Sequence, residues 1–331
     1  AAATAAKTAA DQQCGNRFND LVNDLKAKIF TGESDLSSIA ERILEYDLVT
    51  RLDDVSDLAS AVNVARLLNT NANPEQYAQI AERFGIKSAR VCDRIPFVSC
   101  SYGYTRVESE WKEGVQLHAL KGEKNGRKNI YATKLNTEGV LFEFDRKKII
   151  QWLLANEITN ADEAPNLDSE EEIKIWFLNN IKPSLIHPFS TIDETASKET
   201  YYVYRLIHSL SHLLIRAAAD TGGLGKDSLS EYIFPGVPAV LIYCQNSQGF
   251  NLGSLFNTFE AYFDKWMNKA YTSAQKCIFD PICIERQKAC MGCLFVNEVS
   301  CQHFNKDLDR ALVVGHVDRE TQRRTIGFWE E

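Results

Sequence analysis

Long hydrophobic runs are absent from this sequence. Its longest apolar pieces, such as Ala239–Cys244, fall well short of the ~20 residues that are needed to cross a bilayer. The chain also opens without a charged and then apolar leader. We therefore expect a cytoplasmic protein that makes no membrane contact.

An excess of positive charge is also missing. Lysine and arginine together number 37 against 45 acidic residues, which gives a net charge of -8. This balance excludes a general electrostatic attraction to nucleic acid, because such attraction needs cations that neutralise phosphates. Any DNA contact must come from a partner subunit or from a local basic patch. The sequence offers one such patch, the predicted hairpin that carries Lys121, Lys124, Arg127 and Lys128.

A nucleotide-binding loop is missing as well. The glycine-rich segment 221–228 has some features of a phosphate loop, but Asp220 occupies the position of the leading glycine. Asp227 occupies the position of the serine or threonine that binds Mg²⁺. The segment follows a predicted helix, whereas a phosphate loop follows a strand. Nucleotide binding by this segment is therefore disfavoured.

The sequence also lacks a recognisable hydrolytic centre. His208 and His212 share one face of a predicted helix, but Ser209 stands where zinc proteases carry their general-base glutamate. We interpret both as core or interface histidines, with metal ligation as the open alternative. Paired carboxylates at a suitable spacing for an open catalytic metal site are absent. We therefore predict that the chain is not an enzyme, and keep a metal-dependent hydrolase or nuclease as the alternative.

Cysteine, in contrast, is abundant and clustered. Five of the nine cysteines fall within 25 residues: Cys277, Cys283, Cys290, Cys293 and Cys301. Thiolates that converge on one point bind a soft divalent metal, and zinc with four sulfur ligands fits a reduced chain of this length. A disulfide framework is disfavoured in such a chain. An iron–sulfur cluster and metal-free cysteines remain alternatives.

The spacing of the cysteines narrows the ligand set. Cys290 and Cys293 form a C-x2-C knuckle, in which Gly292 helps to make the tight turn. We predict four ligands, Cys283, Cys290, Cys293 and Cys301. Cys277 is the alternative to Cys283, and His303 is a weaker candidate. Four protein ligands leave no open position for water, so the site is predicted to be structural.

Hydrophobic periodicity predicts an α+β fold. An N-terminal helical unit precedes an antiparallel sheet, and a mixed α/β region closed by a four-cysteine zinc site follows. We expect the chain to be part of something longer. The predicted segments are a tag-like or linker-like stretch at 1–17, a helical unit at 18–95, a sheet at 96–145, a zinc-binding domain at 146–312 and a C-terminal tail at 313–331.

The apolar pattern predicts three elements in particular. A helix is predicted over Ser56–Leu68, and a long, buried helix over Lys198–Asp220. The strand Val237–Cys244 is apolar throughout, which is typical of a strand covered on both faces. It leads into a helix near Gly253, where we expect a simple cap by Asn251 or Ser254. Anion binding at that helix N-terminus is the alternative.

Several of these segments together resemble one family. The helix Tyr201–Arg216 resembles the signature helix of the MrfA-type zinc-binding (MZB) domain. The strand Val240–Tyr243 and the segments Cys277–Cys283, Ala289–Cys293 and Ser300–Cys301 follow in the order of that family. The domain occurs in MrfA-like DNA repair helicases and in DrmB-type components of DISARM anti-phage systems. Because a Walker A motif is missing, the DrmB-type arrangement, with the motor on a separate subunit, is favoured.

The resemblance implies a function. It implies a zinc-containing, non-catalytic accessory subunit that partners a superfamily 2 helicase, DrmA-like in type, and supports DNA binding in bacterial antiviral defence. A protein-interaction scaffold without DNA contact is a further alternative.

Overall fold

The computed structural model describes most of the chain. Its described residues are 17–27, 43–46, 48–50, 52, 54–58, 60–61, 74–101, 103–106, 116–120, 123–124, 127–128, 130–188, 190–225, 227–245, 253–298 and 300–330. The predicted tag-like stretch therefore lies outside the described residues except for Arg17.

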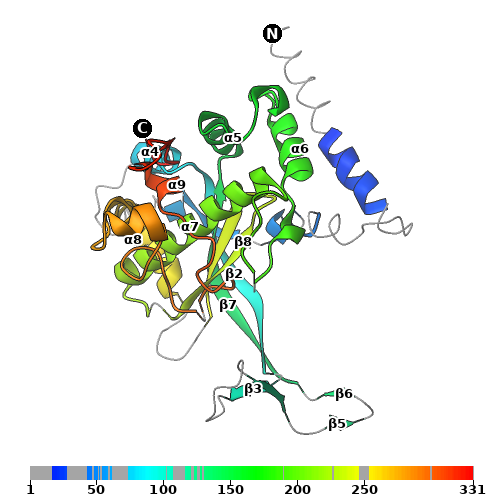
Figure 1. Cartoon of the computed structure of the whole chain (residues 1–331). Helices are drawn as coiled ribbons and strands as arrows, with labels where there is room; N and C mark the ends of the chain where they lie inside the picture. Colours follow the sequence, from blue (N-terminus) through cyan, green and yellow to red (C-terminus); the bar gives the residue numbers. More distant parts are fainter. Residues whose placement is uncertain are drawn as a thin grey trace.

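A five-stranded antiparallel sheet organises the fold, in the order β1-β2-β7-β9-β8 (Figure 1). Its strands are β1 (Asp54–Asp57), β2 (Ile86–Ser101), β7 (Tyr131–Phe144), β8 (Leu229–Phe234) and β9 (Ala239–Cys244). The predicted α+β class is confirmed, since this sheet is combined with helices and a buried four-cysteine group near the C-terminus.

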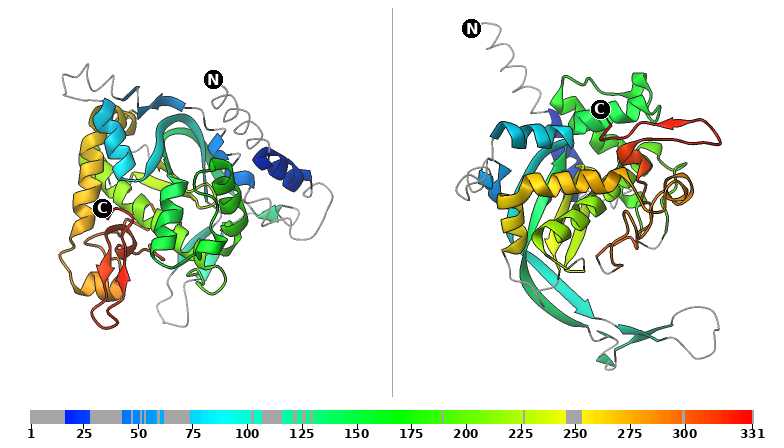
Figure 2. Two further views of the ribbon diagram at one scale, coloured as in Figure 1. Left: turned by 90° about the horizontal axis from the view of Figure 1, so that it is seen from above. Right: turned by 90° about the vertical axis from the view of Figure 1, so that its left-hand side faces the viewer.

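Helices occupy the connections between strands and the C-terminal part of the chain. Among them are α4 (Pro74–Arg83), α5 (Arg146–Ala155), α6 (Glu170–Asn180), α7 (Lys198–Gly222), α8 (Ser254–Gln275) and α9 (Ala311–Val314). Residues 17–27, near the predicted start of the N-terminal helical unit, are helical as well (Figure 1). Short helical turns lie at Ala161–Glu163, Pro183–Leu185 and Cys283–Gln287. Helices α7 and α8 pack on each other and on the sheet (Figure 2).

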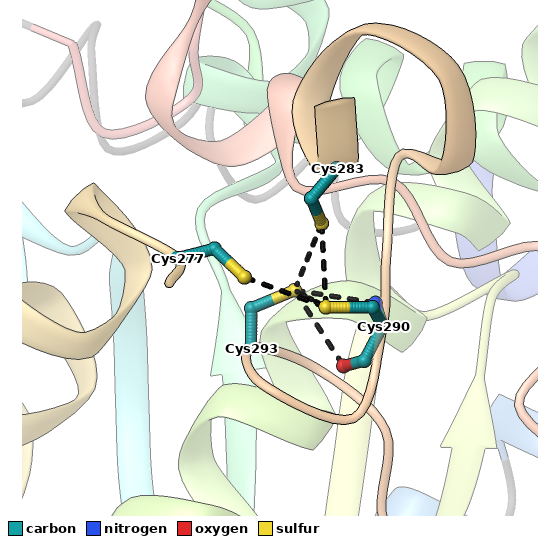
Figure 3. A group of neighbouring side chains, drawn as sticks. All are labelled: Cys277, Cys283, Cys290 and Cys293. Atoms are coloured by element: carbon teal, nitrogen blue, oxygen red, sulfur yellow. Dashed lines mark hydrogen bonds between the residues drawn. The ribbon is translucent and has the colours of Figure 1, made fainter. Parts of the chain in front are cut away.

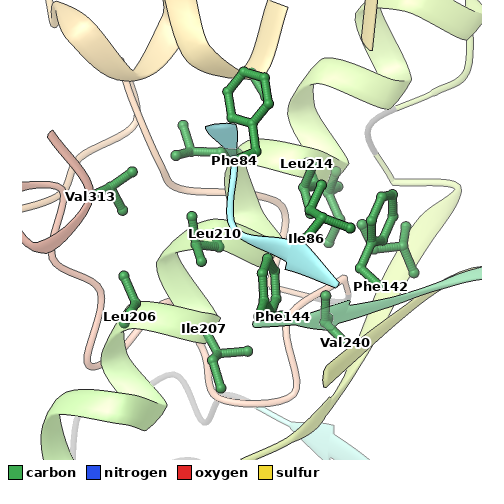
Figure 4. Packing of buried hydrophobic residues seen from close by; sticks show 14 of the residues in the cluster. Phe84, Ile86, Phe142, Phe144, Leu206, Ile207, Leu210, Leu214, Val240 and Val313 are labelled. Carbon is green, nitrogen blue, oxygen red and sulfur yellow. The ribbon is translucent and has the colours of Figure 1, made fainter. Parts of the chain in front are cut away.

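The period-2 alternation of β7 divides the core in two. Val140, Phe142 and Phe144 point into the large cluster under α7 and α8, which Figure 4 shows with Leu210 and Leu214 of α7. The intervening Leu141 belongs to a smaller cluster on the opposite face. Because β9 likewise contributes to both clusters, the prediction that this strand is covered on both faces is confirmed.

Strands β2 and β7 continue beyond the sheet as a two-stranded arm (Figures 1 and 2). Residues 131–136 of β7 are exposed, whereas 137–142 are buried in the body. Two small hairpins extend the arm: β3 (Gly103–Arg106) with β4 (Gln116–Ala119), and β5 (Glu123–Lys124) with β6 (Arg127–Lys128). The predicted basic hairpin is therefore present at the level of its backbone.

The central helix forms where its sequence predicts it. Its N-cap is Ser197, whose hydroxyl accepts a hydrogen bond from the Thr200 amide. The helix ends at Gly222 and is capped by Gly223, which adopts a left-handed conformation with φ 65°. From Val203 to Ile215 every residue is buried, because the sheet, α8 and the C-terminal segment surround this stretch.

Two predicted elements differ from the structure. Ser56 and Asp57 lie in strand β1 and not in a helix, while residues 62–68 of that predicted helix lie outside the described part. Strand β2 begins at Ile86, so the predicted boundary at 95/96 falls inside it. The sheet draws strands from three predicted segments, because β8 and β9 join β7 from beyond residue 145.

The C-terminal segment packs against the body. A small hairpin of β10 (His316–Val317) and β11 (Arg324–Thr325) precedes the buried Phe328 and Trp329. The Trp329 indole donates a 3.1 Å hydrogen bond to the Phe84 carbonyl. Among the described residues, we find no helix that combines the length and the apolar character of a membrane span.

Candidate metal centre

Four buried cysteines converge on one point: Cys277, Cys283, Cys290 and Cys293 (Figure 3). The Sγ atom of Cys290 lies 3.4 Å from that of Cys277, 3.5 Å from that of Cys283 and 3.7 Å from that of Cys293. Cys283 and Cys293 are 3.6 Å apart. A tetrahedron with Zn–S bonds of ~2.3 Å has edges of about 3.8 Å, so this donor set fits a four-sulfur zinc site.

Local structure presents each sulfur to that point. Cys277 follows the end of α8, and Cys283 opens a short π-helical turn. Cys290 and Cys293 share a tight turn, in which the Cys290 carbonyl accepts a hydrogen bond from the Cys293 amide. A Cβ atom at Gly292 would lie 3.2 Å from the Cys277 sulfur, so glycine keeps this approach open.

An ion pair between the buried Arg310 and the partly exposed Asp280 holds the Cys277 loop in place. Arg310 is fully buried, pairs with Asp280 and donates a 3.1 Å hydrogen bond to the Ala274 carbonyl. The other oxygen of Asp280 accepts the Cys277 amide at 2.9 Å. Although burial lowers it, the pairing with Asp280 raises the pKa of Arg310. The guanidinium therefore remains cationic beside the cysteine group, where it offsets thiolate charge.

A second arginine ties the knuckle to the central helix. Arg216 of α7 donates a 2.7 Å hydrogen bond to the Phe295 carbonyl. Longer contacts reach the carbonyls of Met291 and Gly292, at 3.4 and 3.5 Å. The turn with Cys290 and Cys293 is thus fixed against a rigid element.

The structure brings together three of the four predicted ligands and places the fourth elsewhere. Cys283, Cys290 and Cys293 lie in the group, and Cys277 completes it. Cys301 belongs to a different group. His303 joins neither, and burial is the main cause that lowers its pKa to about 4. Cys277 was predicted as an alternative to Cys283, but the structure places both cysteines in the group.

The second group consists of His208, His212, Glu231 and Cys301, all buried. Nε2 of His208 lies 3.2 Å from the Cys301 sulfur and 3.2 Å from Oε1 of Glu231. Nε2 of His212 lies 3.2 Å from the same carboxylate oxygen. The two histidines predicted as core residues are therefore in the core, but beside an acid and a thiol.

Several contacts orient this second group. Nδ1 of His212 is 2.9 Å from the Leu294 carbonyl, and the Ser211 hydroxyl donates to Oε2 of Glu231. Although burial raises it, the hydrogen bond with His208 lowers the pKa of Cys301 to about 7. Sequence reasoning missed Glu231; an acidic residue inside strand β8, which is otherwise mostly apolar, was the signal that could have found it.

The N-terminus of α8 is occupied by the protein itself. The Glu138 carboxylate accepts hydrogen bonds from the Gly253 amide at 2.8 Å and the Leu255 amide at 3.1 Å. The N-cap is Gly253, so Ser254, one of the two predicted caps, is the first residue of the helix and not its cap. The buried Glu138 carboxylate of β7 therefore occupies the helix N-terminus, where the sequence left anion binding open as an alternative. Asn251, the other predicted cap, lies outside the described residues.

Fold and site together define an α+β protein with a buried four-cysteine group suited to a structural metal. In a comparison with known proteins, the chain is 27% identical over 215 residues to the DISARM protein DrmB of Bacillus paralicheniformis. The match covers 59% of this chain and 35% of that protein, so it spans about a third of the relative's length. The predicted resemblance to DrmB-type proteins is thereby confirmed at a distance. No protein-family model matches the sequence.

Proposed function

We propose that this chain is a zinc-containing, non-catalytic component of a DISARM anti-phage system that partners a superfamily 2 helicase and supports DNA binding. The observation that carries the proposal is the four-sulfur group at tetrahedral spacing in a chain similar to DrmB. Cys277, Cys283, Cys290 and Cys293 are its proposed zinc ligands.

Zinc at this position has a structural role. Between Cys277 and Asp309 the described chain forms turns and one short π-helical segment, with little regular hydrogen bonding of its own. Four Zn–S bonds tie such a segment to the end of α8, and the free energy of metal binding becomes free energy of folding. Four protein ligands leave no position for water, which supports a role without catalysis.

A protein partner is supported by the surface beside the four cysteines. Ile278 is 84% exposed and Met291 is 70% exposed, and Phe279 and Ile282 are exposed as well. These apolar side chains stand on the turns that the metal fixes, so zinc and partner binding are coupled in this proposal. An exposed apolar cluster on a rigid support is typical of a protein interface, and the helicase subunit is the partner that we propose for it.

Elemental analysis of the purified chain tests the zinc site. We expect zinc and no iron, with Cys277→Ser and Cys290→Ser each losing the metal of this site. Cys100→Ser is the matched control, because Cys100 is exposed on the arm. Iron with visible absorbance, or a zinc content in both ligand variants as high as in the unmodified chain, would contradict the proposal.

The salt dependence of DNA binding tests the remaining part. The chain carries a net charge of -8, so we expect weak DNA binding alone and a steep salt dependence in the complex with the helicase. Charge reversal at Lys121, Lys124, Arg127 and Lys128 measures what the basic hairpin contributes. Formation of the complex without any gain in DNA binding would instead favour a protein scaffold.

A further inference from the structure

We propose that His208, His212, Glu231 and Cys301 bind a second divalent metal ion of borderline softness, of which Zn²⁺ is the best match. This site is separate from the four-cysteine group and goes beyond the proposed function, which needs a single zinc. It would join α7, β8 and the segment after residue 300 inside the core.

The distances agree with shared coordination. Tetrahedral zinc with Zn–N and Zn–O bonds of ~2.0–2.2 Å has edges of about 3.3–3.6 Å between nitrogen or oxygen ligands. Nε2 of each histidine lies 3.2 Å from the same Glu231 oxygen, Oε1. The edge between His208 Nε2 and the Cys301 sulfur is 3.2 Å, against about 3.6 Å for a mixed nitrogen–sulfur edge. Two nitrogen atoms, one oxygen atom and one sulfur atom thus lie close enough together to share one metal ion.

The hydrogen bonds of His212 fix which of its ring nitrogens faces the group. The Leu294 carbonyl is an acceptor, so the Nδ1 atom 2.9 Å away carries the proton. In neutral His212 the Nε2 lone pair then faces the Glu231 carboxylate, which is another acceptor. Either a proton, which makes an ion pair, or a metal ion must therefore lie between the two atoms, and the measurement of metal content below separates the two. A carbonyl that fixes the second ring nitrogen is the usual support for a metal-bound histidine.

Cys301 is held as a thiolate would be. Its sulfur accepts the amides of His303 and Asn305, each at 3.3 Å. To aim these amides the chain adopts left-handed conformations at Phe304 and Asn305, with φ 55° and 57°. The Asn305 side chain locks that turn, since it both donates to and accepts from the Val296 backbone.

The net charge of the proposed complex is compatible with its burial in the core. A divalent ion with one carboxylate, one thiolate and two neutral imidazoles is a neutral complex, which burial penalises least. Nitrogen, oxygen and sulfur donors in one set favour a borderline ion such as Zn²⁺ over Mg²⁺ or Ca²⁺. The four residues are at most 2% exposed, so the site is closed and structural.

Metal stoichiometry and ligand type of the unmodified chain provide the test. The full chain, purified without oxygen and loaded with Zn²⁺, should hold two zinc ions per chain. X-ray absorption at the zinc edge should then show nitrogen or oxygen neighbours as well as sulfur. One zinc per chain with sulfur neighbours only would overturn the second site and leave the four-cysteine site standing. The group would then be a metal-free ion pair of Glu231 with histidine.

Substitutions separate the two sites. Cys301→Ala should lower the zinc content from two to one and leave a signal from four sulfurs alone. Cys290→Ser should lose the other zinc and keep the mixed nitrogen, oxygen and sulfur signal. Cys100→Ala is the matched control and should keep both ions. Two retained ions in Cys301→Ala would also overturn the proposal, and the measurement on the unmodified chain decides the matter should a variant not fold.

Discussion

The two clusters differ in depth and in charge. Four thiolates around a divalent ion form an anionic complex, and this group lies beneath a surface where Ile278 and Met291 are exposed. The second cluster lies in the core and forms a neutral complex when a divalent ion is bound. Desolvation penalises an unbalanced charge most in the interior, so the deeper position suits the proposed neutral complex and the position nearer the surface suits the proposed anionic one.

The supports around the clusters follow the same rule. The anionic cluster is accompanied by a cationic side chain, Arg310, and by the hydrogen bonds of Arg216 to its turn. The neutral cluster is held by uncharged contacts, namely the Ser211 hydroxyl and the Leu294 carbonyl. Arg310, Arg216 and Ser211 can each be substituted separately, so the stability that each side chain contributes to its cluster can be measured.

Loss of a ligand from the four-cysteine group should have the largest effect. A structural zinc contributes about 10–16 kcal/mol of apparent binding free energy in zinc-finger peptides. We therefore expect Cys293→Ser to lower the free energy of unfolding by several kcal/mol, measured by urea titration with and without zinc. Cys100→Ser should match the unmodified chain. Equal stability of the two variants would show that this cluster does not hold the C-terminal region.

Removal of the cation beside the anionic cluster should come next. Arg310→Met leaves Asp280 without its partner and the Ala274 carbonyl without its donor; because Asp280 is 29% exposed, we expect a loss between the about 0–1 kcal/mol of an exposed pair and the about 3–5 kcal/mol of a fully buried one. Arg319→Gln breaks an exposed pair with Glu285, for which about 0–1 kcal/mol is expected. Chemical denaturation of both variants compares the two values. Similar losses would mean that Arg310 has no special role.

Removal of the support beside the neutral cluster should have a smaller effect. Ser211→Ala leaves Oε2 of Glu231 without its donor, and a hydrogen bond to a charged group is worth about 1.5–3 kcal/mol. Ser273→Ala is the control, since that hydroxyl only bonds carbonyls of its own helix. Thermal unfolding should show a clear loss for the first variant and almost none for the second. The same small loss in both would argue that Glu231 is not held by Ser211.

Metal release should differ in rate. Cys277 and Cys290 are each 8% exposed, whereas His208, His212 and Glu231 are 0% exposed. A local opening that costs about 1.4 kcal/mol less gives roughly tenfold faster release. A colorimetric chelator should therefore record a fast zinc from the four-cysteine site and a slow one from the core. A single phase for both ions would indicate that the two clusters open together.

Loss of the surface ion pair between Glu170 and Lys174 should have the smallest effect on the free energy of unfolding. This pair is remote from both clusters, so it shows how much a surface carboxylate alone contributes to the loss of stability in acid. The hydrogen bond from Lys174 lowers the pKa of Glu170, so the unfolded chain takes up this proton first as pH falls. The stabilisation is complete above the ordinary pKa of 4.5 and is lost as pH falls through the lowered value. We expect about 0.3–0.5 kcal/mol, measured as the difference between Glu170→Gln and the unmodified chain across that range. An effect of this size at pH 7 that persists in acid would contradict the ion pair.

Sequence patterns predicted the regular elements unevenly. Helix α7 begins at the predicted Lys198 and ends two residues after the predicted Asp220, because its apolar face is continuous. Strand β2 begins well before its prediction, since Lys87, Arg90 and Asp93 interrupt the apolar alternation and the pairing shifts register between Cys92 and Ile95. When charged residues interrupt the apolar alternation of a partly exposed strand, the pattern does not show where the strand begins.

The candidate site was predicted in part for a similar reason. The knuckle of Cys290 and Cys293 is local and follows from spacing alone, as does the density of cysteines around it. The choice between Cys277 and Cys301 does not follow from spacing. It depends on Asp280, which is paired with Arg310 and accepts the Cys277 amide, so that the loop places the Cys277 sulfur beside the knuckle.

The sequence by itself determined the elements and contacts whose partners are close along the chain: the buried face of α7, the apolar strand β9 and the two-cysteine turn. The tertiary structure alone decided which sulfurs meet, and it brought His208 to Cys301 across 93 positions. The physical reason is that local contacts follow from backbone geometry, whereas contacts over such separations form only when packing of α7 against β8 and the C-terminal turns closes the long loops between them.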